Sequence, residues 1–121
     1  MMSEQKMYSI VVRHLSGMQK GIQSGHSNVE YGISNKDPKY KRWQKVDKTV
    51  CVLETTSVSQ LRHAITILNN YGIKTVPFYE PDLDCIMTSF SFLLPEEVWG
   101  NTTPENQDLR AFILTFNLAQ N

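Results

Sequence analysis

Four short apolar runs, rich in β-branched and aromatic residues, occur along this chain, and polar turn residues separate them. They span residues 7–13, 49–54, 73–79 and 85–94. Runs of this length and composition are typical of buried strands. The pattern therefore predicts four strands.

Between the apolar runs, apolar residues recur at three- and four-residue intervals, which predicts amphipathic helices. The first helix is expected to begin near Gly17, because Ser16 and Gln19 have the spacing of a capping box, and to stop near Tyr31. Further helices are expected over residues 39–45, over residues 58–70 before Gly72, and from Pro104 after the N-cap Thr103. Helices connecting strands one, two and three are typical of crossovers, so these three strands are expected to be parallel.

The helix that begins near Gly17 has a polar stripe and an opposing apolar stripe. The polar stripe comprises Lys20, Gln23, Ser24 and Ser27, and the apolar stripe comprises Met18, Ile22, Val29 and Ile33. The start of a helix that follows a strand is a common ligand site in open α/β sheets, so the polar stripe is expected to face a ligand. His26 lies beside the apolar stripe, which favours a partly buried, hydrogen-bonded histidine over a catalytic one.

Length and charge narrow the possible functions. A chain of 121 residues suits one domain, and no apolar run approaches the roughly 20 residues of a membrane-spanning helix. The formal net charge is zero, yet residues 1–76 hold 11 Lys and Arg against 5 Asp and Glu, whereas the remainder holds 1 against 7. A basic region able to hold a polyanion and an acidic region are thus expected in one domain located in the cytoplasm.

Two further groups of residues bear on chemistry. Cys51 and Cys85 lack the spacing of metal ligands and are expected to be buried free thiols. The turn at residues 80–84 holds three carboxylates and follows the third strand, so it is expected at the same sheet edge as Lys20. One carboxylate there is suited to act as a general base. The alternatives are a weak Mg²⁺ or Ca²⁺ site and an ordinary acidic surface turn.

Three local stretches, taken in order, resemble the type 2 peptidyl-tRNA hydrolase family. Residues 7–13 resemble its opening strand, and Gln-Ser-Gly-His-Ser at 23–27 is similar to the end of its G-K-x-A-A-Q-C-x-H-A motif. Residues 42–53, with Arg42-Trp43 and the run from Lys48, resemble its tryptophan and second strand. The resemblance spans nearly the whole chain. Together with the crossovers, it predicts a single α/β domain over residues 1–121, with a four-stranded mixed sheet in which the first three strands are parallel and the fourth is antiparallel, and with helices on both faces.

The resemblance implies hydrolysis of the ester between a peptide and the terminal ribose of tRNA, without a metal or other cofactor. The implied catalytic residues are Lys20, Glu80, Asp82 and Thr88. The implied substrate-binding residues are Gln19, Gln23, His26, Lys39, Lys41, Arg42 and Lys45. In this scheme the lysine stabilises an oxyanion or holds a phosphate, a carboxylate positions water, and the basic helix grips the tRNA backbone.

The sequence departs from the family pattern at the catalytic positions. Gln19 occupies the lysine position, and Lys20 matches it only if one residue is deleted near the helix start. Glu80 or Asp82 stands in place of the family's aspartate, its first threonine has no counterpart, and Thr88 or the following serine replaces the second. Two other functions therefore stay open: a catalytically inactive module of the same fold that binds RNA, a nucleotide or a protein, and an assembly domain such as a homodimer.

Overall fold

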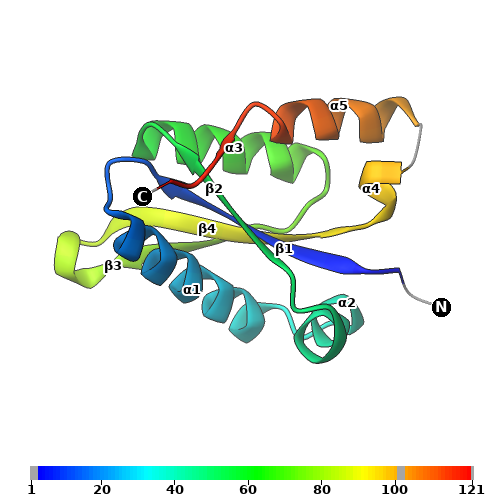
Figure 1. Cartoon of the computed structure of the whole chain (residues 1–121), viewed down its shortest axis with the longest axis horizontal. Coiled ribbons are helices and arrows are strands. Elements are labelled where there is room, and N and C mark those ends of the chain that lie inside the picture. Colours follow the sequence, from blue (N-terminus) through cyan, green and yellow to red (C-terminus); the bar gives the residue numbers. More distant parts are fainter. Residues whose placement is uncertain (1–2, 101–102, 121) are drawn as a thin grey trace.

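The fold is a mixed sheet in the order β3-β4-β1-β2-β5, with helices on both faces (Figure 1). The computed structural model describes residues 3–100 and 103–120. The strands are β1 (Gln5–Val12), β2 (Val50–Thr55), β3 (Val76–Glu80), β4 (Ile86–Pro95) and β5 (Asn117–Leu118). The helical segments are α1 (Gly17–Ser34), α2 (Pro38–Arg42), the π-helical turn η1 (Trp43–Asp47), α3 (Val58–Asn70), the 3-10 turn η2 (Pro81–Leu83), α4 (Glu97–Gly100) and α5 (Pro104–Ile113).

The expectation of a four-stranded sheet with three parallel strands was wrong. Among the described residues the sheet has five strands, and only the pair β1–β2 is parallel, whereas β4 is antiparallel to both β1 and β3, and β5 is antiparallel to β2. The tight turn after β3 folds β4 back beside it, and β4, nearly all of which is buried, lies between β3 and the central strand β1. The short β5 has no hydrophobic pattern from which it could be predicted.

Two layers of helix cover the sheet unequally. In Figure 1, α3 and α5 lie on one face, and α1 and α2 lie on the other. The larger apolar cluster lies on the side of α3 and α5, and it includes Ile10, Leu61, Phe90 and Phe92. A smaller cluster of Met7, Tyr31 and Leu93 holds α2 and η1 in place, with Tyr40 and Trp43 against it. The Trp43 indole also donates a hydrogen bond of 2.7 Å to the Thr49 carbonyl.

The predicted helix boundaries are largely confirmed. The side chain of Ser16 accepts a hydrogen bond from the Gln19 amide, and Thr103 caps α5 in the same way. Gly72 has the left-handed conformation expected after α3, with φ of 78°. The helix α1 runs to Ser34, three residues beyond the predicted stop.

The helix α1 packs on the sheet through its polar stripe, contrary to expectation. Gln23, Ser24 and Ser27 are buried, whereas the apolar side chains of Met18, Ile22, Val29 and Ile33 are 41–77% exposed. The reason is that the facing surface of the sheet carries hydroxyls, namely those of Ser9, Thr88, Ser89 and Ser91. The hydroxyls of Ser9 and Ser24 are hydrogen-bonded, as are those of Ser27 and Ser91 at 2.7 Å. Neither α1 nor any other helix in the described part of the chain is long and apolar enough to cross a membrane.

The cysteines depart in part from the expectation of buried thiols. Both are free, but Cys51 is half-buried and Cys85 is exposed. Cys85 follows Asp84 in a tight turn, and both have left-handed backbones with φ near 55°. The thiol is exposed because β4 begins only after this turn.

Candidate functional site

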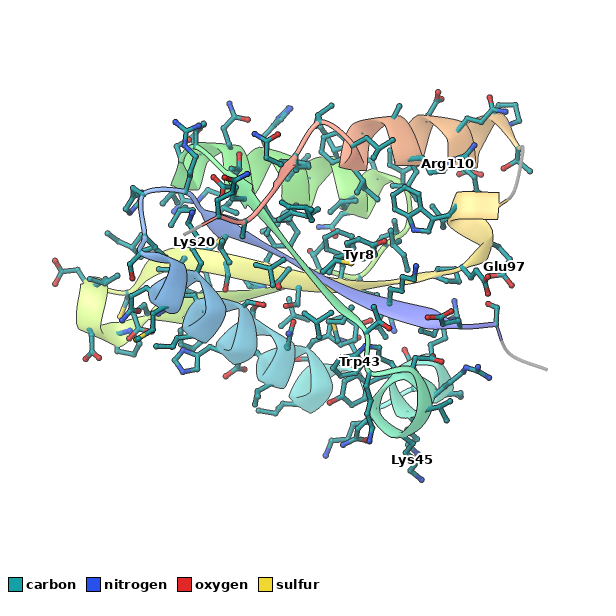
Figure 2. The ribbon with its side chains drawn as sticks, viewed as in Figure 1. Tyr8, Lys20, Trp43, Lys45, Glu97 and Arg110 are labelled. Atoms are coloured by element: carbon teal, nitrogen blue, oxygen red, sulfur yellow. The ribbon has the colours of Figure 1, made fainter. Side chains whose placement is uncertain are left out.

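Lys20 lies with Glu54, at the end of β2, rather than with the acidic turn. Its Nζ is 3.1 Å from Glu54 Oε1, and it donates a second hydrogen bond of 2.6 Å to the Gln120 carbonyl. The amide of Gln120 in turn donates to Glu54 Oε1 at 2.7 Å. Both charged side chains are buried, and Figure 2 shows Lys20 close to the C-terminal segment. The charge of Lys20 is therefore neutralised within the protein.

The electrostatics of Glu54 support this description. Burial alone raises the pKa of its carboxyl, but hydrogen bonds from Lys20 and the Gln120 amide, together with the charges of Lys20 and Arg13, outweigh that effect. The net result is a pKa below the ordinary value. Glu54 is thus an ionised partner that holds Lys20 at the edge of a cavity of about 380 Å³, which Arg13 also lines.

The acidic turn divides between a buried carboxylate and exposed ones. Glu80 is buried at the end of β3, whereas Asp82 and Asp84 are exposed. Glu80 Oε2 lies 3.6 Å from His26 Nδ1, and the His26 ring packs against Phe78 with the ring centroids 4.6 Å apart. The His26 side chain remains 46% exposed. The residue meeting the predicted general base is therefore a half-exposed histidine, not Lys20.

A chain of hydrogen bonds runs from the sheet to the surface beside His26. Thr88 Oγ1 donates to Gln23 Oε1 at 2.6 Å, and Gln23 Nε2 donates to Gln19 Oε1 at 3.4 Å. Thr88 and Gln23 are buried, whereas Gln19 is exposed. Gln19 accepts this bond through its oxygen, so its amide nitrogen is the atom that it can offer to a ligand as a donor. Gln19, Gln23 and His26 follow i, i+4, i+7 spacing and so share one side of α1.

We call the group of Gln19, Gln23, His26, Glu80 and Thr88 the His26 site. Its parts come from α1, from the end of β3 and from the start of β4. These elements meet because α1 packs across β3 and β4, and β4 begins at the sheet end where β3 finishes. A carboxylate oxygen 3.6 Å from an imidazole nitrogen, beside an amide donor, is an arrangement able to move a proton and to stabilise a developing negative charge.

The predicted tRNA-binding cations lie beyond the C-terminal end of α1. Lys39, Lys41 and Lys45 are exposed, and Figure 2 shows Lys45 projecting from the body of the protein. Arg42 is instead paired with Asp47, at 3.2 Å. His26 lies eight residues before the end of α1, which is about 12 Å along the helix axis. Cations and the His26 site are thus on one side of the sheet.

Sequence reasoning missed Glu54 and Gln120 as partners of Lys20. The available signal was a charged residue ending an otherwise apolar strand, since a carboxylate there needs a cation. No such signal marks Gln120, whose backbone makes the contacts. Within residues 3–100 and 103–120, no group of three or more His, Cys, Asp or Glu side chains is arranged to hold a metal ion.

Comparisons with known proteins yield no match, either with the models of protein families or among curated proteins. The structure itself therefore gives the class: this is an α/β protein, and the part of the chain that the structure describes forms a five-stranded mixed sheet. Its His26 site is the starting point for a function.

Proposed function

We propose that this chain hydrolyses the ester bond between a peptide and the terminal ribose of tRNA, and that it does so at the His26 site. One observation carries the proposal. Gln23 and His26, which belong to the stretch that resembles the hydrolase motif, lie against Thr88 and Glu80, which the same resemblance places in the catalytic set. These pairs are 65 and 54 residues apart in the sequence, so only the fold unites them.

The chemistry assigns a role to each group. The Glu80 carboxylate faces Nδ1 of the imidazole at 3.6 Å, and Nε2 of His26 takes a proton from water as the water oxygen attacks the ester carbonyl. The Gln19 amide stabilises the negative charge on the carbonyl oxygen, and Gln23 and Thr88 fix that amide. The bond to the ribose oxygen then breaks and His26 returns the proton to that oxygen. The products are a peptide with a free carboxylate and a tRNA with its hydroxyl restored.

The exposed lysines bind the phosphate backbone of the tRNA. Lys39, Lys41 and Lys45 suit phosphate contacts that are independent of sequence. Three such contacts predict that the logarithm of the tRNA association constant falls by about 2 to 3 per tenfold increase in salt. A tRNA substrate also implies a cytoplasmic protein.

The direct test is release of peptide from a purified peptidyl-tRNA. We expect His26→Ala and Glu80→Gln to reduce turnover by about a hundredfold or more, and Gln19→Ala to reduce it by at least tenfold or so. Asp82→Asn is the matched control, because Asp82 is an exposed carboxylate in the turn directly after Glu80. The absence of release above the rate without protein, or equal release by His26→Ala, would refute the proposal.

A second candidate function is a binding module that holds tRNA without cleaving it. Two observations favour it. Lys20 is already ion-paired with Glu54, and the buried Thr88 hydroxyl is already hydrogen-bonded to Gln23, so both groups have partners within the protein. In that case, tRNA binding would show the salt dependence above and would weaken in Lys39→Glu and Lys45→Glu, while the ester stayed intact. The same peptidyl-tRNA preparation distinguishes the two functions.

A further inference from the structure

The last residues of β4 form an open strand edge at the end of the sheet remote from the His26 site. The pairing of β3 with β4 begins with Val76 opposite Ser91. Residues 92–95 therefore have β1 on one side and, within the described chain, no strand on the other. This edge is about 13 Å long, at the usual rise per residue.

The orientation of the backbone at this edge follows from Pro77. Proline has no N–H, so in an edge strand its backbone lies on the side that makes no ladder hydrogen bonds. The backbone N–H and C=O groups of its neighbours Val76 and Phe78 therefore point toward β4. Val76 and Phe78 lie opposite Ser91 and Ser89, which thus turn their backbone groups toward β3. Since alternate residues of a strand face the same side, the N–H and C=O of Leu93 face the open edge.

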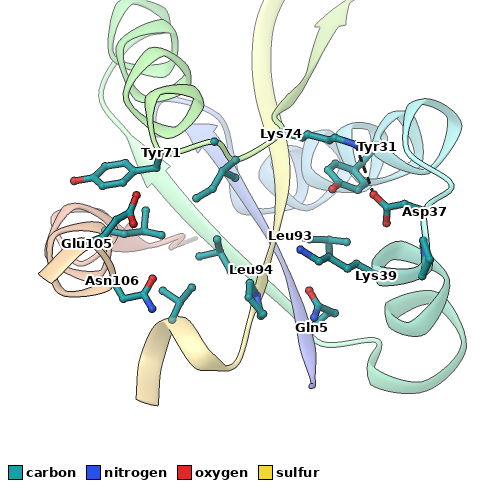
Figure 3. Close-up of a pocket in the computed structure, with 16 residues that line it drawn as sticks. Gln5, Tyr31, Asp37, Lys39, Tyr71, Lys74, Leu93, Leu94, Glu105 and Asn106 are labelled. Carbon is teal, nitrogen blue, oxygen red and sulfur yellow. Dashed lines mark ion pairs between the residues drawn. The ribbon is translucent and has the colours of Figure 1, made fainter. Parts of the chain in front are cut away.

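The open edge lies in a groove rather than on a flat surface. A cavity of about 530 Å³ surrounds it, which is within the range of ligand sites. Figure 3 shows this groove with β4 through its middle, Asn106 of α5 on one side, and Asp37 and Lys39 on the other. Leu93 and Leu94 themselves are buried.

The two sides of the groove differ in chemistry. On the side of α5 the floor is apolar, formed by Leu94 with Ile73 and Val98. On the side of α2 the lining includes Gln5, which is only 1% exposed. Its Nε2 donates to the Ser3 carbonyl at 3.2 Å, but its buried Oε1 has no hydrogen-bond partner. An unpaired buried acceptor is unfavourable, and a donor entering the groove would offset that cost.

We propose that this groove binds an extended peptide segment of a partner protein, which adds a strand to the edge of β4. The backbone of the peptide pairs with the N–H and C=O of Leu93, and the peptide lies on the same edge of β4 as β3, beyond the start of β3. Successive side chains of a strand point to opposite faces. One peptide side chain is therefore apolar and packs on Ile73, Leu94 and Val98, and the next carries a hydrogen-bond donor for Gln5 Oε1.

The helices that flank the groove favour a single chain over a second copy of this protein. Helices α2 and α5 border the edge on both faces, and both line the cavity together with Leu93. The edge of a second copy would bring its own pair of flanking helices against them. A lone extended segment meets no such obstacle.

Amide exchange in the isolated protein tests the open edge without any ligand. The N–H groups of Phe92 and Leu94 face β1, so their exchange is expected to be slow, whereas that of Leu93 is expected to be much faster. Equal protection of the three amides would mean that the edge is already paired, and the proposal would fall.

The second experiment selects peptides from a displayed library of random octapeptides on the full chain. The selected peptides are expected to share an apolar residue followed by one with a side-chain donor, and to slow exchange at Leu93. Asn106→Trp, which fills the groove, should weaken their binding by about tenfold or more. Ala111→Trp, on the exposed face of the same helix, should leave binding unchanged. Glu105→Trp is the second groove variant if the first fails to fold.

Three further results would also overturn the proposal. One is a selection that yields no shared pattern, and another is binding that Asn106→Trp does not alter. The third is a dimer of the protein alone that Asn106→Trp dissociates, which would assign the groove to a second copy. Loss of the preference for a donor in Gln5→Met would, by contrast, support the assignment of that side chain. None of these measurements depends on the proposed hydrolase activity.

Discussion

Removing the charge of Lys20 is expected to destabilise the protein strongly, because the residue is a structural partner of Glu54. In Lys20→Met, the buried carboxylate of Glu54 keeps only the Gln120 amide as a hydrogen-bond donor among the contacts seen at that oxygen. In Glu54→Gln, the Lys20 ammonium keeps the Gln120 carbonyl but loses its counter-charge. Each single variant thus removes the direct ion-pair partner of a buried charge.

The size of the effect follows from the burial of the pair. Breaking a buried ion pair costs about 3–5 kcal/mol, and the lower end applies here because the pair borders an open cavity. We therefore expect a loss of about 3 kcal/mol in the free energy of unfolding for Lys20→Met, and somewhat less for Glu54→Gln. The double variant removes both charges and should be about 2 kcal/mol more stable than the sum of the single effects predicts.

The assay is urea denaturation of the four proteins at neutral pH, followed by repetition in acid. The pKa of Glu54 is lower in the folded state than its ordinary value, so its stabilising effect is present above that ordinary value and disappears as the pH falls through the lowered one. The advantage of the wild type over Glu54→Gln should shrink accordingly. A cost below about 1 kcal/mol for Lys20→Met, or additive single effects, would refute the buried pair.

Three further predictions concern the core. Burial, with a contribution from the charge of Asp37, raises the pKa of Tyr31 to about 12. Because the unfolded tyrosine ionises first, Tyr31 should contribute a fall in stability of about 2.7 kcal/mol between about pH 10 and 12, and alkaline denaturation curves of Tyr31→Phe should lack this contribution. Ser27→Val should cost about 2 kcal/mol in urea, since it removes the two hydrogen bonds that the Ser27 hydroxyl makes with Ser91 Oγ and with the Ser24 carbonyl. Val29→Ser on the exposed side should change stability by less than about 0.5 kcal/mol, and equal effects of the two variants would contradict the inverted packing. Gly32→Ala places a Cβ on the Tyr40 hydroxyl and should lower the melting temperature by about 4–8 °C per kcal/mol of overpacking, which calorimetry would detect.

Local signals predicted most of the secondary structure but not its arrangement. The caps at Ser16 and Thr103 and the left-handed Gly72 depend on a few adjacent residues, so the sequence alone reveals them. The order of the strands depends on which strands bury the most apolar surface at the inner positions of the sheet, and only the packing of the whole chain decides that. The same holds for the pairing of Lys20 with Glu54 across 34 residues, which replaced the expected pairing with the acidic turn.

The helix α1 separates what the sequence determines from what the tertiary structure decides. Its sequence determined that it is a helix, where it begins, and that one stripe is polar and the other apolar. The sequence pattern did not determine which stripe faces the sheet, because that depends on what the sheet offers. Here the sheet offers hydroxyls from β1 and β4, and hydrogen bonds between buried hydroxyls avoid the cost of leaving them unpaired. Only the tertiary structure therefore turned the polar stripe inward, left the apolar stripe exposed, and brought His26 beside Glu80.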